Sequence, residues 1–153
     1  MRKKIIFPMF FLMVITLGMY MWLNRINYDI YEKRSNTEVN PKDGIHFTIE
    51  ANKKNGSLRI ENNSDRYIVI DFGRKPIHIE IQQGDGWHRI LSHKSVNGEP
   101  CAIPEGTTYS LDFTWRNFVN GPLKPGDYRA ILYFGDGISE IYTYSVMAEF
   151  CID

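Results

Sequence analysis

The sequence has little of what marks an enzyme. Its 153 residues include two cysteines and four histidines, and neither cysteine has a histidine close to it in the chain. The motif Gly-x-Ser-x-Gly, which positions a nucleophilic serine, does not occur. Because no nucleophile with its base is recognisable, we expect neither catalytic residues nor a cofactor.

The sequence also lacks an excess of charge of either sign. Its 18 Lys and Arg balance 18 Asp and Glu, and three of the basic residues occupy positions 2–4, ahead of a long apolar run. The remaining 15 basic residues stand against 18 acidic ones, a net charge of −3 for the rest of the chain. A mildly acidic domain argues against nucleic acid as a partner.

Metal-binding patterns are weak. No histidine is spaced from another His, Cys or acidic residue as in a metal motif. Two Gly-Asp-Gly sequences, at 84–86 and 135–137, each offer one carboxylate where a calcium site needs several oxygens, and we interpret both as hairpin turns. We expect no metal at these turns or at the histidines, which are His46, His78, His88 and His93.

One long apolar run stands near the N-terminus. Residues 5–23 contain no charged side chain, and a helix over them is about 28 Å long, close to the apolar thickness of a bilayer. Basic residues beside such a span stay on the cytoplasmic side. We therefore expect residues 1–23 to be a single-pass anchor in the cell membrane, with the remaining chain extracytoplasmic.

The alternative is a cleavable signal peptide, which would release a secreted protein. Thr16 and Gly18 are small enough to stand three and one before a cut. Against cleavage, the apolar character continues through residues 19–23, where Tyr20 and Trp22 suit the aromatic belt of an outer membrane boundary.

The chain after the run divides into a stalk and a β domain. Residues 24–44 are mostly polar, without apolar periodicity, and predict a loosely ordered stalk. Residues 45–153 alternate apolar and polar residues between turn sequences, which is typical of strands packed on one face. Seven to nine short strands predict an all-β fold of two antiparallel sheets, because a single sheet would leave one apolar face unburied. We expect the strands near 45–51, 58–60, 67–72, 76–82, 87–91, 107–115, 128–134 and 142–152.

The most specific local sequence is Leu123-Lys124-Pro125-Gly126-Asp127-Tyr128. A Pro-Gly turn followed by Tyr near a strand start is similar to the tyrosine corner of immunoglobulin-like sandwiches, in which the Tyr hydroxyl bonds to backbone a few residues upstream. The alternative is a simple turn with a packed Tyr. Ala130 stands where an antibody domain has the second cysteine of its disulfide.

Together with three other pieces, this corner resembles the bacterial immunoglobulin-like domains found singly in small exported or anchored proteins. The other pieces are the strand and turn at 58–65, Gly86-Trp87, and the ending at 146–150. The resemblance spans residues 45–152 and implies an immunoglobulin-like sandwich with an extracytoplasmic, non-enzymatic role. It implies nothing about the two cysteines.

Cys101 and Cys151 face an oxidising compartment if the predicted topology holds, and paired cysteines are common there. Cys151 is out of phase with the apolar residues of its strand, so its side chain is expected to point away from the core. A surface disulfide between the two, free thiols and an intermolecular bridge all stay open.

Two functional hypotheses from different classes follow. The first is a non-catalytic binding or structural module that recognises an envelope protein or a second copy of itself, for example by strand addition at the edge strand 45–51. The second is a proteinase inhibitor that presents the loop 97–106, stiffened by Pro100 and Pro104. A ligand sensor is a third option, although a four-residue tail offers no cytoplasmic output module.

Overall fold

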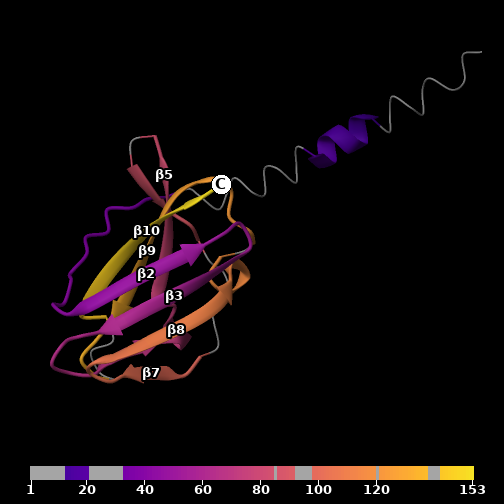
Figure 1. Cartoon of the computed structure of the whole chain (residues 1–153). Helices are drawn as coiled ribbons and strands as arrows, with labels where there is room; N and C mark the ends of the chain where they lie inside the picture. Colours follow the sequence, from indigo (N-terminus) through magenta and orange to yellow (C-terminus); the bar gives the residue numbers. More distant parts are fainter. Residues whose placement is uncertain (1–12, 21–32, 85, 92–97, 120, 138–141) are drawn as a thin grey trace, which may run out of the picture.

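The structure, a computed structural model, describes residues 13–20, 33–84, 86–91, 98–119, 121–137 and 142–153. Within them the chain from residue 33 onward forms antiparallel strands and two short 3-10 helices (Figure 1). The strands are β1 (Lys33–Arg34), β2 (Ile45–Ala51), β3 (Asn55–Asn62), β4 (Ile68–Asp71), β5 (Ile77–Gln83), β6 (Gly86–Arg89), β7 (Pro100–Ile103), β8 (Thr107–Thr114), β9 (Gly126–Phe134) and β10 (Tyr144–Ile152). The 3-10 helices are η1 (Phe72–Arg74) and η2 (Trp115–Asn117).

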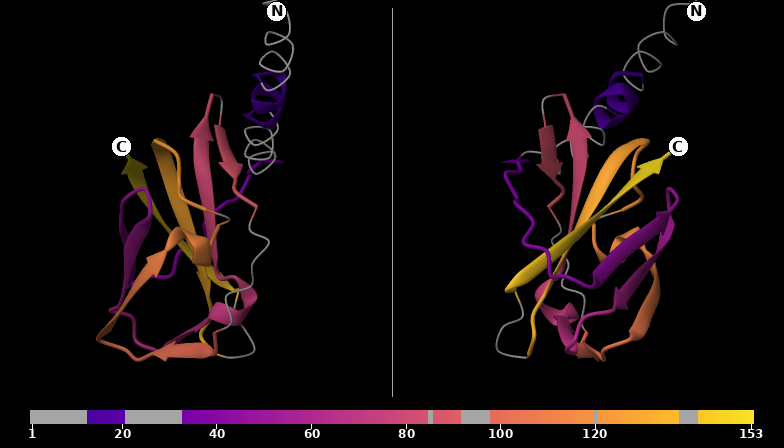
Figure 2. Two further views of the ribbon diagram at one scale, coloured as in Figure 1. Left: turned by 90° about the vertical axis from the view of Figure 1, so that its right-hand side faces the viewer. Right: turned by 60° about the vertical axis from the view of Figure 1, so that its left-hand side comes forward.

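The strands form two facing sheets, which Figure 2 shows as separate layers. One sheet has the order β2-β3-β8 and the other the order β1-β6-β5-β9-β10, while β4 pairs with β7 in a short ladder. The arrangement confirms the predicted all-β sandwich of antiparallel sheets. β5 and β6 are adjacent antiparallel strands, with Gln83 opposite Gly86, as the hairpin predicted at this place requires.

Alternating apolar residues put one face of each sheet into the core. In β2, burial alternates at every residue from Ile45 to Glu50, and Phe47 lies opposite Ile60 of β3, which is also buried. In β5, Ile77, Ile79 and Ile81 also face the core, while Glu80 between them is buried on the other face of the sheet. This period of two is what lets a short strand cover a core on one side and meet solvent on the other.

Three stacked aromatic rings hold the sheets together at one end of the core. Phe150 lies between Trp115 and Tyr128, with ring centroids 5.4 Å and 5.5 Å away. Trp115 and Tyr128 are fully buried, and the indole Nε1 of Trp115 donates a hydrogen bond of 2.7 Å to the carbonyl of Asn52. The stack therefore links β10 and β9 to the end of the three-stranded sheet.

The sequence 123–128 has the contact of a tyrosine corner. The hydroxyl of Tyr128 donates a hydrogen bond of 2.7 Å to the carbonyl of Lys124, four residues upstream. Leu123 is buried beside it, and its backbone N–H donates to the carbonyl of Lys53 in the β2–β3 turn. Pro125 and Gly126 make the turn between these two anchored residues.

We expect Tyr128→Phe to lower the free energy of unfolding by about 1–2 kcal/mol, because the ring stays packed while the carbonyl of Lys124 loses this donor. Urea unfolding of the variant measures this. Tyr67→Phe is the matched control, since the Tyr67 side chain is 52% exposed and should change little. Equal stabilities for the two variants would contradict the role of the corner.

The N-terminal boundary of the domain differs from the prediction. Residues 33–44, predicted as part of a stalk, lie against the five-stranded sheet; we call them the strap. β1 pairs with β6, and the backbone of Asn40 is hydrogen-bonded to Ser145 at the start of β10. Further on, Lys42 pairs with Asp136 at 2.5 Å. The strap thus crosses from one edge of this sheet to the other before the chain enters β2.

Part of the predicted membrane span is also described. Residues 13–20 are helical. The rest of the apolar run, residues 5–12 and 21–23, lies outside the described residues. Within the described part of the chain, we find no helix with both the length and the apolar character needed to cross a membrane.

Candidate functional site

Two strand edges face each other across a groove on one side of the sandwich. β2 is an edge strand of the three-stranded sheet, and β10 is an edge strand of the five-stranded sheet. Within the described residues, neither strand pairs with a further strand on its outer side. The groove between them has a volume of about 350 Å³. It is lined by Val39, Pro41, Ile45, His46, Phe47, Thr48, Val146 and Met147.

The register fixes which backbone groups of β10 point into this opening. The N–H of Ser145 donates to Asn40 of the strap, so it points away from β9. Because backbone groups alternate sides along a strand, the N–H and C=O groups of Met147, Glu149 and Cys151 point the same way. Met147 and Glu149 also have exposed side chains. The strap therefore engages the start of this edge at Ser145, and the edge beyond it faces the opening.

The same reasoning applies to β2. The carbonyl of Gly44 accepts from Asn63, so it faces β3. The backbone groups of Phe47, Ile49 and Ala51 therefore face the outer edge, toward β10. Edge strands of this kind are templates on which another chain can add a strand.

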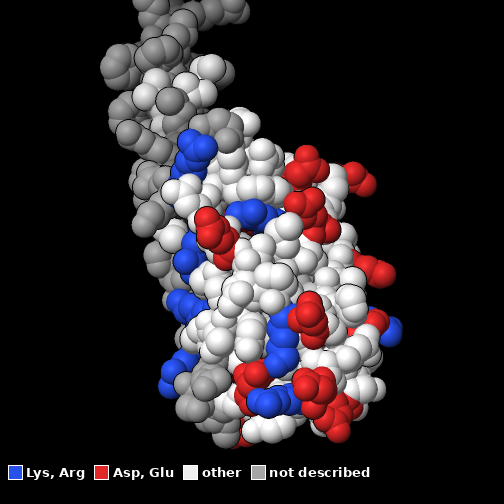
Figure 3. All heavy atoms as spheres, turned by 90° about the vertical axis from the view of Figure 1, so that its left-hand side faces the viewer, with Lys and Arg blue, Asp and Glu red and all other residues white. Residues whose placement is uncertain are grey.

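Acidic side chains lie around the end of the β10 edge. Asp127 is opposite Cys151 in the β9–β10 register, and Glu149, Asp127 and Asp153 are all exposed. Figure 3, which looks at the side of the molecule that lies at the left in Figure 1, shows acidic side chains gathered along the upper right of this face. The open edge is thus apolar on its groove side and negative on its outer side.

A buried ion pair lies under the strap on the same sheet. Glu80 of β5 is fully buried, and its carboxylate pairs with the Arg129 guanidinium at 2.6 Å. The hydroxyls of Ser35 and Thr37 in the strap also donate to this carboxylate. The guanidinium lies 4.8 Å from the ring centroid of Trp87. A buried carboxylate needs such partners, so the strap and the ion pair depend on each other.

We expect Glu80→Gln to lower the free energy of unfolding by about 3 kcal/mol, because the Arg129 charge then stays buried without a countercharge. The exposed pair of Arg59 and Glu61 gives a matched control, since Glu61→Gln should change the stability by less than about 0.5 kcal/mol. Hydrogen exchange of residues 33–40 should speed up in the first variant alone. Unchanged exchange there would show that Glu80 does not hold the strap.

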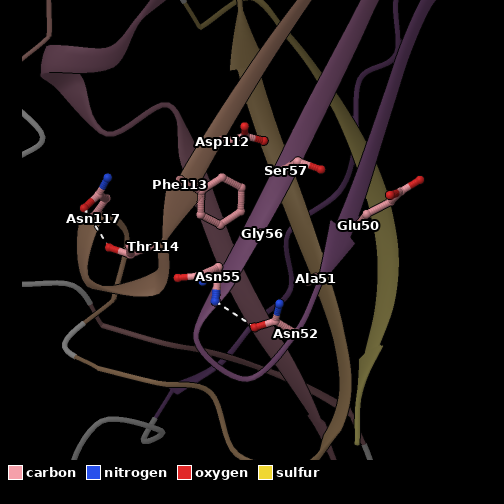
Figure 4. A pocket seen from close by; sticks show the side chains of 10 residues that line it. All are labelled: Glu50, Ala51, Asn52, Asn55, Gly56, Ser57, Asp112, Phe113, Thr114 and Asn117. Carbon is pink, nitrogen blue, oxygen red and sulfur yellow. Dashed lines mark hydrogen bonds between the residues drawn. The ribbon is translucent and has the colours of Figure 1, made fainter.

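A polar cleft lies on the three-stranded sheet, at the β2–β3 turn (Figure 4). Its volume is about 760 Å³. Glu50, Ser57 and Asp112 form one cross-strand row there, and the side chain of Asn52 accepts hydrogen bonds from the backbone of Lys54 and Asn55. The lining residues are Glu50, Ala51, Asn52, Asn55, Gly56, Ser57, Asp112, Phe113, Thr114 and Asn117.

The floor of this cleft is built by Gly56 and Phe113. An added Cβ at Gly56 would lie 2.6 Å from Cζ of Phe113, so the ring packs against the strand only because the residue is glycine. The lining offers carboxylates, amides and hydroxyls, but it includes no histidine, cysteine or lysine. The cleft therefore presents hydroxyl, amide and carboxylate groups that can form hydrogen bonds.

The histidines do not converge in the described structure. His46, His78 and His88 lie on β2, β5 and β6, and His93 falls outside the described residues. No group of three or more His, Cys, Asp or Glu side chains suited to a metal occurs among the residues described. Burial, together with the nearby Arg89 charge, lowers the pKa of His78 to about 4, although Glu80 acts to raise it. Its ring packs 4.7 Å from that of Tyr133.

The lowered pKa of His78 makes stability depend on pH. The unfolded chain binds a proton at His78 below about pH 6.5, whereas the folded chain does so only near pH 4. We therefore expect stability to fall as pH drops from 6.5 to 4, by about 1–2 kcal/mol for this partly exposed group. Urea unfolding at pH 7, 5.5 and 4 measures it. His78→Gln should flatten the profile more than His46→Gln on the exposed face of β2, and equal slopes would rule out His78 as the cause.

The two cysteines are not bridged, although a disulfide between them was one of the three arrangements left open by the sequence. Both cysteines are free, so the disulfide between them is not formed. Cys101 lies in β7 and Cys151 near the C-terminus, at opposite ends of the domain in Figures 1 and 2. The Cys151 side chain is exposed, as strand parity predicts.

Residues 97–106 do not form one continuous loop. Pro100–Ile103 is the strand β7, paired with β4, and Ile103 is buried. Asn97 lies outside the described residues. Pro104 follows β7, and its carbonyl accepts from the hydroxyl of Thr107. This segment is therefore largely part of the sandwich.

The antiparallel sandwich and its tyrosine corner agree with a match to a known family. The sequence matches the family described as Bacterial Ig-like domain over residues 33–150. The chain belongs to this bacterial Ig-like family. No curated protein matches the sequence. The family match begins at residue 33, where the strap of this bacterial Ig-like domain begins, and it supports a non-catalytic structural or binding module.

Proposed function

We propose that this protein is a membrane-anchored, extracytoplasmic Ig-like domain that binds another protein of the cell envelope by strand addition. The observation that carries the proposal is the open edge of β10 from Met147 to Cys151, next to an apolar groove. Main-chain hydrogen bonds at such an edge give affinity, while the groove selects side chains of the incoming strand.

The proposed anchor rests on the sequence. Three basic residues at 2–4 precede an uninterrupted apolar run of residues 5–23, long enough to span a bilayer as a helix. Since the strap begins at Lys33, the proposed anchor and the first strand are joined by residues 24–32. Such a short connection keeps the domain close to the membrane, where its partners would be other envelope proteins.

Site-specific photo-crosslinking of the full-length chain in intact cells tests this proposal. With the crosslinker at Met147, which is 42% exposed at the edge, we expect a discrete protein adduct in the membrane fraction, and its mass should include residues 1–23. The control position is Arg59 on the central strand β3, both edges of which are already paired. Adducts of equal yield at both positions would contradict edge recognition, and a chain found only in shortened, soluble form would contradict the anchor.

Proline at position 149 tests how much the backbone N–H of this residue contributes to binding of the partner strand. The Glu149 N–H points outward, and proline is tolerated on an edge strand where its missing N–H faces solvent. Glu149→Pro should therefore keep the fold but abolish the Met147 adduct. Glu149→Ala, which retains the N–H, should preserve most of it. If both variants crosslink as well as the parent chain, the β10 edge is not the binding site.

A further inference from the structure

We infer that the strand received by β10 is a basic, extended segment of a different protein, in which apolar residues alternate with Lys or Arg. This inference rests on the proposed function, because it names the chemistry of the partner at the same edge. It follows from the two faces that the incoming strand must present and from the charges around the end of β10.

The first face of the incoming strand must be apolar. β2 and β10 are close neighbours along the groove, so the incoming strand extends the five-stranded sheet alongside Met147, Glu149 and Cys151 of β10. Its inward side chains would enter the groove lined by residues such as Val39, Phe47 and Val146. Because side chains alternate along a strand, every second residue of the partner meets this apolar surface.

The second face must meet negative charge. Glu149 is exposed on the outer side of β10, and Asp127 and Asp153 are exposed near its end. Arg129 lies opposite Glu149 in the register, but its guanidinium is turned to the buried carboxylate of Glu80. The outward residues of an added strand would therefore be neighbours of carboxylates, and lysine or arginine there gives favourable cross-strand pairs.

The same charges argue against a second copy as the occupant. A two-fold pairing of β10 with another β10 would bring both sets of Glu149, Asp127 and Asp153 to one interface. Like charges opposite each other in a sheet are destabilising. The acidic edge thus selects against self-pairing while it admits a basic strand.

Fluorescence anisotropy with two labelled peptides tests the inference on the full chain in a non-ionic detergent. One probe alternates valine and lysine, and the other, of equal length, alternates valine and glutamate. We expect the lysine probe to bind about tenfold more tightly at low salt, with a difference that shrinks as salt is added. Glu149→Lys should reduce that ratio, whereas Glu61→Lys, the same change on the outer face of β3, should leave it nearly unchanged.

The outcomes separate this inference from the proposed function. Equal binding of both peptides, lost in Glu149→Pro but kept in Glu149→Ala, would overturn the basic partner and leave strand addition standing. Lysine-probe binding that survives equally in Glu149→Pro and Glu149→Ala would show attraction by charge without strand pairing, and would overturn both. A Met147 crosslink to another copy of this chain would replace the basic partner by self-association.

Discussion

Glu80 and Arg129 form a buried ion pair on the face of the sheet that does not cover the core, and the arrangement of the N-terminal strap follows from it. A fully buried carboxylate is tolerated only when its oxygens are occupied. Arg129 supplies the countercharge, and Ser35 and Thr37 supply the hydroxyls. Without the strap the Glu80 carboxylate would lose both hydroxyl donors, so residues 33–44 belong to the folded domain. The family match, which also starts at residue 33, agrees with this boundary.

The strap in turn determines which strand edges are engaged. Its first residues pair with β6, and Asn40 is bonded to the start of β10 at Ser145. The chain then turns into β2, with Lys42 held by Asp136 and close to the ring of Tyr144. Beyond Ser145, the backbone groups of Met147, Glu149 and Cys151 face outward from β9. The buried pair and the open edge are therefore consequences of one chain path.

The sequence was sufficient for the elements with regular alternation and for the tyrosine corner. β2 buries every second residue, and the Leu-Lys-Pro-Gly-Asp-Tyr sequence makes its contact within four residues. The strap could not be found in this way. Ser35 and Thr37 are polar although they face the sheet, and their contacts with Glu80 span more than forty positions. Its polar composition therefore predicts a stalk. β7 is short and lies in a segment rich in Gly and Pro, so the sequence shows no alternation that would predict its pairing with β4.

The candidate binding edge was only partly visible in the sequence, because an edge is a property of strand order rather than of residue type. The sequence suggested the edge of β2, whose alternation is clear, but the opening depends equally on β10. In β10, Glu149 looks like an ordinary solvent-facing residue of an alternating strand. Only the register shows that its backbone faces an opening and that Arg129, its neighbour on β9, is committed to Glu80. A negative charge at an open edge discourages pairing with like edges, and for the same reason it makes the edge selective.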